Sequence, residues 1–129
     1  MRGFLLPPVT APGNPGENEL LPQTVAELQR LRLSAREVAL DGGFQTNASA
    51  EALAPLAPER TFIAGRASPG SRRTQRRLTR YRVGAERRIS HLKRRHGLRR
   101  SRLKGDEGER TWSGWAVFAY NVETYGRYA

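Results

Sequence analysis

The 129-residue chain contains no cysteine. Disulfide bonds and thiolate zinc sites are therefore excluded, and the composition is compatible with a reducing cytosol. Long apolar runs are also missing. The stretch Phe4–Leu6 is followed by two prolines, so it is too short for the apolar core of a signal peptide or for a membrane span. We expect a soluble intracellular protein with no membrane partner.

Acidic residues are almost absent from one long stretch. Between Arg66 and Lys104 the sequence has sixteen Lys and Arg residues, and Glu86 is the single acid. The formal net charge is +11, yet the rest of the chain has seven bases and eleven acids. The positive charge is therefore local. Clustered arginines favour bidentate contacts with the phosphates of a nucleic acid, whereas a membrane-seeking surface would be more uniformly cationic.

Proline and glycine are concentrated at the start of the chain. Residues 1–18 contain four of the eight prolines. We expect this segment to be irregular, with at most a short edge strand near Leu5–Thr10. Residues 19–129 are enough for one domain with a modest core.

Apolar spacing predicts alternating helices and strands in the first half of the chain. Residues 19–33 have helical spacing, and residues 37–40 and 61–64 are typical of short strands. A second helix is expected between the two strands. This order indicates an α/β fold with a short, incomplete sheet flanked by helices.

Polar residues close to these helices are candidate N-caps. Asn18 could cap the first helix. Asn47 or Ser49 could cap the second, which would run through Leu53 or Leu56.

The second half is predicted to contain two more helices. Residues 65–79 show no apolar periodicity and are interpreted as a basic loop or hinge. Helical spacing returns over residues 81–96 and ends at Gly97. It returns again over about residues 109–122.

Two groups of side chains in these helices have both a structural and a functional interpretation. The helical spacing of Trp112, Trp115 and Tyr120 among small residues predicts a packed core, with base stacking as the alternative. His91 and His96 are five residues apart, about 140° around a helix. We therefore expect that they do not share a metal ion as histidines four residues apart do.

Glu86 is the most informative acid of the chain. On a helix of about 100° per residue, Arg82, Glu86 and Lys93 project from one face. A carboxylate between two cations can bind a divalent ion while the cations hold nearby phosphates. Alternatively, Glu86 forms an exposed ion pair with Arg82 or a neighbouring arginine, worth about 0.3 to 0.5 kcal/mol.

Asp41 is the second candidate. It ends a predicted strand and is followed by Gly42 and Gly43, which let the backbone turn sharply. Ligands of α/β proteins collect at the carboxyl ends of strands, although Asp-Gly is also a common turn pair with a purely structural role. Phosphodiester chemistry with two metal ions needs hard oxygen ligands that converge from separate elements, and Asp41 and Glu86 are of this type.

Several motifs together resemble one protein family. They are the DGGF strand end, the R-x3-E-x6-K helix, the SHLKRRHGL run and the W-x-G-W helix with Asn121. Over about Gly13 to Val122 the chain resembles the C-terminal half of the catalytic domain of bacterial insertion-sequence DDE transposases. That resemblance implies a partial ribonuclease H-like fold, and an activity that cleaves phosphodiesters at the element ends and transfers the strands to target DNA.

The resemblance also implies roles for individual residues. Asp41 corresponds to the second metal-binding aspartate and Glu86 to the closing glutamate, both catalytic and both ligands of Mg²⁺ in a two-metal site. Arg82 and Lys93 correspond to the basic residues of the signature helix that meet DNA. The neighbouring bases expected to clamp the DNA backbone are Arg87, Arg88, Arg94, Arg95, Arg99, Arg100 and Arg102.

The first aspartate of the family has no counterpart, because no Asp precedes Asp41. We therefore expect a transposase fragment with an incomplete metal site and weak or absent catalysis. Its expected partners are transposon-end and target DNA, and another copy of the chain or an intact transposase, at the nucleoid in a bacterial cytoplasm. One alternative is a small basic module that binds RNA or the ribosome without catalysis. Another is an inactive remnant that interferes with an intact transposase.

Overall fold

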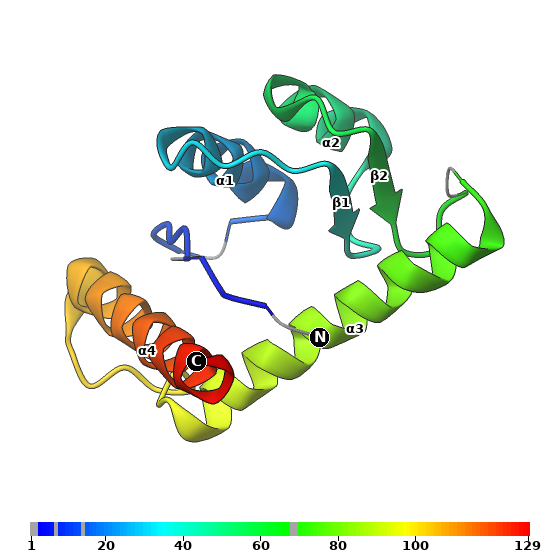
Figure 1. Ribbon diagram of the computed structural model, residues 1–129. Coiled ribbons are helices and arrows are strands. Elements are labelled where there is room, and N and C mark those ends of the chain that lie inside the picture. Colours follow the sequence, from blue (N-terminus) through cyan, green and yellow to red (C-terminus); the bar gives the residue numbers. More distant parts are fainter. Residues whose placement is uncertain (1–2, 7, 14, 68–69) are drawn as a thin grey trace. The chain divides into compact units, whose positions relative to one another are not determined.

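The computed structural model describes residues 3–6, 8–13, 15–67 and 70–129 (Figure 1). In chain order its elements are α1 (Glu17–Arg30), β1 (Glu37–Leu40), α2 (Thr46–Leu53), the 3-10 helix η1 (Ala54–Leu56), β2 (Arg60–Ile63), α3 (Arg72–Arg95) and α4 (Gly105–Tyr128). In this part of the chain the fold is mixed α/β with a short two-stranded sheet. The predicted class, an α/β fold with an incomplete sheet, is confirmed.

The chain forms two compact units. We call Gly13–Val83 the sheet unit, and Met1–Pro12 together with Gly84–Ala129 the helical unit. Helix α3 contributes its first half to the sheet unit and its second half to the helical unit.

The two strands of the sheet unit pair in parallel, with Glu37 opposite Arg60 and Leu40 opposite Ile63 (Figure 1). The predicted strand at 37–40 is confirmed, and the second strand begins one residue earlier than predicted. One face of the sheet packs on α1 and α2. The buried side chains of this core are Leu21, Val25, Leu40, Leu53 and Ile63.

The first half of α3 is joined to β1 by an ion pair. Neighbouring residues of a strand point to opposite faces, so Glu37 and Phe62 lie on the face away from the α1 and α2 core. The Arg77 guanidinium of α3 donates to Glu37 Oε2 at 2.7 Å, and Arg60 donates to Glu37 Oε1 at 2.9 Å. Phe62 is buried, as is Leu78 of α3.

Replacing Glu37 with glutamine is expected to lower the free energy of unfolding by about 1 to 2 kcal/mol, because two guanidinium groups lose a half-buried acceptor. Urea denaturation followed by circular dichroism measures the change. The matched control is Glu59→Gln, which removes the exposed ion pair with Arg36 and should change stability little. Equal losses in the two variants would show that Glu37 does not fasten α3.

The predicted basic loop over residues 65–79 is wrong from Arg72 onward, where α3 already begins. The backbone N–H of Thr74 donates to Ser71 Oγ at 3.3 Å, a contact typical of a helix N-cap. A helix with few apolar residues forms here because Leu78 is buried and Arg77 is paired. Neither the ion pair of Arg77 nor the burial of the single residue Leu78 produces an apolar periodicity in the sequence.

The predicted caps of the first two helices are also wrong. Gly16 caps α1 and Gln45 caps α2, in each case without a side-chain hydrogen bond. Asn18 lies inside α1, where its Oδ1 accepts from the backbone N–H of Gln45 at 2.9 Å. Ser49 is buried within α2. The side chain of Asn18 therefore joins two segments rather than capping its own helix.

The predicted edge strand near residues 5–10 is absent from the described residues of that segment, and Pro7 lies outside them. The backbone of Leu5 is instead satisfied by one side chain in the helical unit. Its N–H donates to Asn121 Oδ1 at 2.8 Å, and its carbonyl accepts from Asn121 Nδ2 at 2.7 Å. The amide offers a donor and an acceptor side by side, as a neighbouring strand would.

Helix α4 begins at Gly105, before the predicted start, and continues to Tyr128. Its buried positions include Ala116 and Val117, which form a core with Leu92 of α3. Trp115 is 65% exposed, so the prediction that it belongs to the core is wrong. None of the helices in the described ranges has the length and apolar character needed to cross a bilayer.

The side chain of Trp112, in α4, contacts the backbone just after the end of α3. Its indole N–H donates to the carbonyl of Gly97 at 2.8 Å. Gly97 has φ +73°, and a Cβ there would lie 3.2 Å from the Trp112 ring. Both the left-handed backbone and the close ring favour glycine, so the predicted helix stop at Gly97 is confirmed.

Candidate functional site

Asp41 lies directly after β1, at the carboxyl end of the parallel pair. The side chain of Asp41 is exposed, and its Oδ1 accepts from the backbone N–H of Gly42 at 2.8 Å. A Cβ on Gly42 would lie 3.1 Å from the Ala64 carbonyl oxygen, so glycine lets the chain turn close to the end of β2. The tight turn therefore leaves the carboxylate accessible.

Arg82 of α3 is the second group at this place. Its Nη1 lies 3.0 Å from Asp41 Oδ1, and its side chain is only 27% exposed. The structure thus brings together two predicted site residues that are 41 positions apart in the sequence. Both contacts of the Asp41 side chain fall on Oδ1, and among the described residues no contact engages Oδ2. Gly42 and Arg82 together hold Oδ1 in place.

Glu86 lies four residues after Arg82 and seven before Lys93, within α3. The side chains of these residues therefore share one helix face, as the sequence predicts. Glu86 is exposed and belongs to the helical unit, whereas Asp41 and Arg82 belong to the sheet unit.

The other predicted DNA contacts continue along α3 and into the loop that follows. Most of them are exposed, while Arg88 is half-buried. A hollow in the helical unit is lined by Arg95, Arg99, Arg100, Arg102, Lys104 and Trp112 together with small and neutral residues. Among the described residues that line this hollow there is no acid, so its chemistry suits a phosphate backbone.

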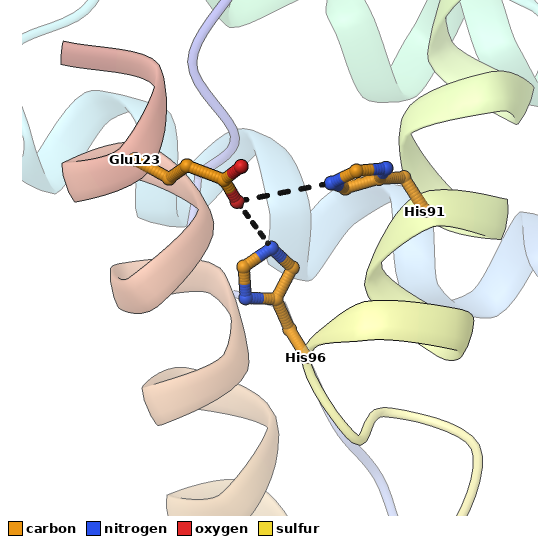
Figure 2. A group of neighbouring side chains, drawn as sticks. All are labelled: His91, His96 and Glu123. Atoms are coloured by element: carbon orange, nitrogen blue, oxygen red, sulfur yellow. Dashed lines mark ion pairs between the residues drawn. The ribbon is translucent and has the colours of Figure 1, made fainter. Parts of the chain in front are cut away.

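His91, His96 and Glu123 form a group that the sequence prediction missed (Figure 2). Glu123 Oε2 lies 3.0 Å from Nε2 of His96 and 3.8 Å from Nε2 of His91. The sequence argument against a metal ion shared by His91 and His96 considers their positions on one helix alone. In the structure the Nε2 atoms of both histidines face the same carboxylate oxygen of α4, which that argument does not take into account. The sequence gives one indication of this group, namely that Glu123 lies at helical spacing with the aromatic residues of the last helix.

The charge on Glu123 is stabilised by its surroundings. Partial burial raises its pKa, but the positive charges of Arg127 and Arg95, with those of the two histidines, outweigh this effect and hold the pKa below its ordinary value. Arg127 forms an ion pair with Oε1. The carboxylate is therefore ionised at neutral pH, with Oε2 turned toward the imidazoles.

Comparison with known proteins adds one finding. The sequence model of the family described as "Transposase DDE domain" matches residues 3–122. No curated protein and no solved structure matches the chain. The match covers most of both units and every residue predicted above to bind metal or DNA, whereas Glu123 follows its last residue.

Proposed function

Because the chain belongs to the transposase DDE domain family, we propose that it is part of a ribonuclease H-like catalytic domain that cleaves and joins DNA at the ends of an insertion sequence. Transposition is the general function of the family. The finer assignment rests on one observation in particular, the contact between Asp41 and Arg82. It fixes an acid at the carboxyl end of a parallel strand and leaves one of its oxygens open.

As the family resemblance implies, Asp41 and Glu86 are proposed to be ligands of the same divalent metal site. Both carboxylates are hard oxygen ligands of the kind that Mg²⁺ prefers. Within the sheet unit Asp41 pairs with Arg82, and Arg82 precedes Glu86 by one helical turn of α3. Bound Mg²⁺ would act as a Lewis acid toward the scissile phosphate and lower the pKa of the attacking water or hydroxyl.

The chain's own residues have two further roles in this proposal. Arg82 holds Asp41 Oδ1 and thereby aims Oδ2, which makes Arg82 a positioning residue. Lys93 and the exposed arginines after it bind the DNA backbone and neutralise phosphate charge. Residues 1–40 contain no aspartate, so the first aspartate that the family resemblance implies has no counterpart among them. We therefore propose that the 129-residue chain binds metal and DNA together but cleaves weakly or not at all.

A protein partner is part of the proposal. On α4, four large side chains at helical spacing are exposed, namely Trp115, Phe118, Val122 and Tyr125. An apolar stripe of this kind favours association with another protein surface. A second copy or an intact transposase fits a reaction that must hold DNA ends together in the bacterial cytoplasm, at the nucleoid.

Manganese-dependent DNA binding tests the proposed acids. At constant ionic strength, Mn²⁺ is expected to strengthen binding of a DNA duplex by about 5- to 150-fold, the usual range for two coupled ligands. Asp41→Asn and Glu86→Gln should each abolish this gain. Without metal, both variants should bind DNA as well as or better than the parent chain, because a repelling charge is gone. Fluorescence anisotropy measures all of these affinities.

The control variants are Asp106→Asn and Glu51→Gln, which remove exposed acids elsewhere and should keep the manganese effect. The double variant Asp41→Asn with Glu86→Gln should lose no more than either single variant, because both acids hold the same ion. A manganese effect that survives in both single variants would show that Asp41 and Glu86 do not hold the ion. The absence of any manganese effect in the parent chain would favour the alternative, a basic module that binds nucleic acid without a metal site.

A further inference from the structure

The group of His91, His96 and Glu123 in the helical unit differs in chemistry from the proposed catalytic acids, because it offers two imidazole nitrogens beside a carboxylate (Figure 2). We infer that these three side chains bind one transition-metal ion of the zinc type, with the two imidazole Nε2 atoms and Glu123 Oε2 as ligands. Imidazole nitrogens suit Zn²⁺, whereas Mg²⁺ prefers oxygen ligands. The inferred site therefore takes a different metal from the one proposed for Asp41 and Glu86, and it does not depend on that proposal.

The spacing of the ligand atoms fits a tetrahedral ion. With bonds of about 2.0 to 2.2 Å, two tetrahedral ligands of zinc lie about 3.4 Å apart. The observed distances from Glu123 Oε2 are 3.0 Å to His96 Nε2 and 3.8 Å to His91 Nε2. All three ligand atoms lie within 4.8 Å of one another. The two distances from Glu123 Oε2 therefore each lie within about 0.4 Å of the tetrahedral value.

The Nε2 atom of His96 gives a second reason. It is buried and has no hydrogen-bond partner among the described residues. Its distance of 3.0 Å from Glu123 Oε2 is short enough for a hydrogen bond, so the two atoms are close but not aligned as donor and acceptor. A buried polar atom without a partner is costly. An ion between the nitrogen and the oxygen would satisfy both.

Neighbouring side chains already hold the ligands in place. Arg127 engages Oε1 of Glu123, which leaves Oε2 for the metal. Tyr120 meets both imidazole rings edge-on, with ring centroids 5.9 Å from His91 and 6.0 Å from His96. Such outer contacts orient metal ligands and are a regular part of metal sites.

Three protein ligands leave a fourth position, which adjoins a cavity of about 220 Å³. His91 and Glu123 line this cavity together with Tyr120, Arg87 and Arg88. The guanidinium groups favour an anionic fourth ligand, such as hydroxide or a phosphate oxygen, and so offset the repulsion between the arginines and a dication. The ligands come from α3, from the turn after it and from α4, so the ion would join the end of one helix to the other.

Metal titration of the full chain tests the inference. After treatment with a chelator, the chain is titrated with Zn²⁺ and, separately, with Co²⁺. We expect one ion per chain, a visible absorption spectrum of tetrahedral Co²⁺, its loss when Zn²⁺ is added, and a higher Tm with either ion. Excess Mg²⁺ should not displace the cobalt.

Single variants then locate the site. His91→Ala and His96→Ala are each expected to weaken Co²⁺ binding by more than about 100-fold, since loss of an outer contact alone weakens metal sites by about 10- to 100-fold. The matched control is Glu107→Gln, which removes an exposed acid from the first turn of the same helix as Glu123 and should bind cobalt like the parent chain.

The metal titration of the unsubstituted parent chain tests the inference even if a variant fails to fold. If it binds no Zn²⁺ or Co²⁺ at one ion per chain, the inference is wrong. The inference is also wrong if a folded variant in which both His91 and His96 are replaced by alanine binds Co²⁺ as tightly as the parent chain. Neither result touches the manganese test of Asp41 and Glu86, so the two proposals fail separately.

Discussion

Replacing Lys93, Arg99 and Arg100 with glutamine is expected to weaken binding of a DNA duplex on the order of 100-fold at low salt. All three side chains are exposed, and the two arginines line the acid-free hollow beside Trp112. Each phosphate contact contributes about 1 kcal/mol and releases a counterion. The slope of log affinity against log salt should therefore fall by about 0.9 per lost contact. Anisotropy titrations at several salt concentrations give both quantities.

A second triple variant separates local from overall charge. Arg30, Arg32 and Arg36 lie outside the basic stretch, and two of them are paired with Glu27 and Glu59. Their replacement with glutamine removes the same formal charge but should change DNA affinity and its salt slope only slightly. Equal losses in the two triple variants would mean that DNA responds to net charge alone and that the proposed DNA-binding surface is wrong.

Replacing Leu92 with alanine is expected to have the largest effect on stability, about 2 to 5 kcal/mol. Leu92 is 3% exposed and forms the core of the helical unit with Ala116 and Val117. Both neighbours are small, so they cannot fill the space that a shortened side chain leaves. Proteins of this size are stable by about 5 to 15 kcal/mol, so the variant would lose a large part of its stability. Urea denaturation with circular dichroism measures it.

Ile89 provides the control on the same helix. It has the same apolar character as Leu92 but is 45% exposed, so Ile89→Ala should lower the free energy of unfolding by less than about 1 kcal/mol. If the two alanine variants were equally stable, the core of the helical unit would have to lie elsewhere. The Leu92→Ala variant should also bind Co²⁺ more weakly, because Leu92 follows the ligand His91 on α3. The Ile89→Ala variant should bind Co²⁺ like the parent chain.

The helices and strands were predicted well where burial follows the periodicity of the element. Helix α1 is an example, since its buried residues Leu21 and Val25 are four positions apart. Prediction failed where a tertiary contact replaces apolar burial. The sequence predicts a loop over residues 72–79, whereas the ion pair of Arg77 with Glu37 and the burial of Leu78 favour a helix there. The sequence also predicts that Trp115 belongs to the core, but this side chain is exposed. Spacing alone does not say which face of a helix packs against the rest of the protein.

The order of residues alone determined that this chain is strongly basic over one stretch, that it alternates helices and strands, and that Asp41 ends a strand. These properties follow from composition and from local periodicity, which need no partner in space. Only the tertiary structure decided that Arg82 meets Asp41, and that His91, His96 and Glu123 converge at the end of α3. Residues far apart in sequence become neighbours through packing, and spacing along one helix does not say which side chains of another helix will meet them.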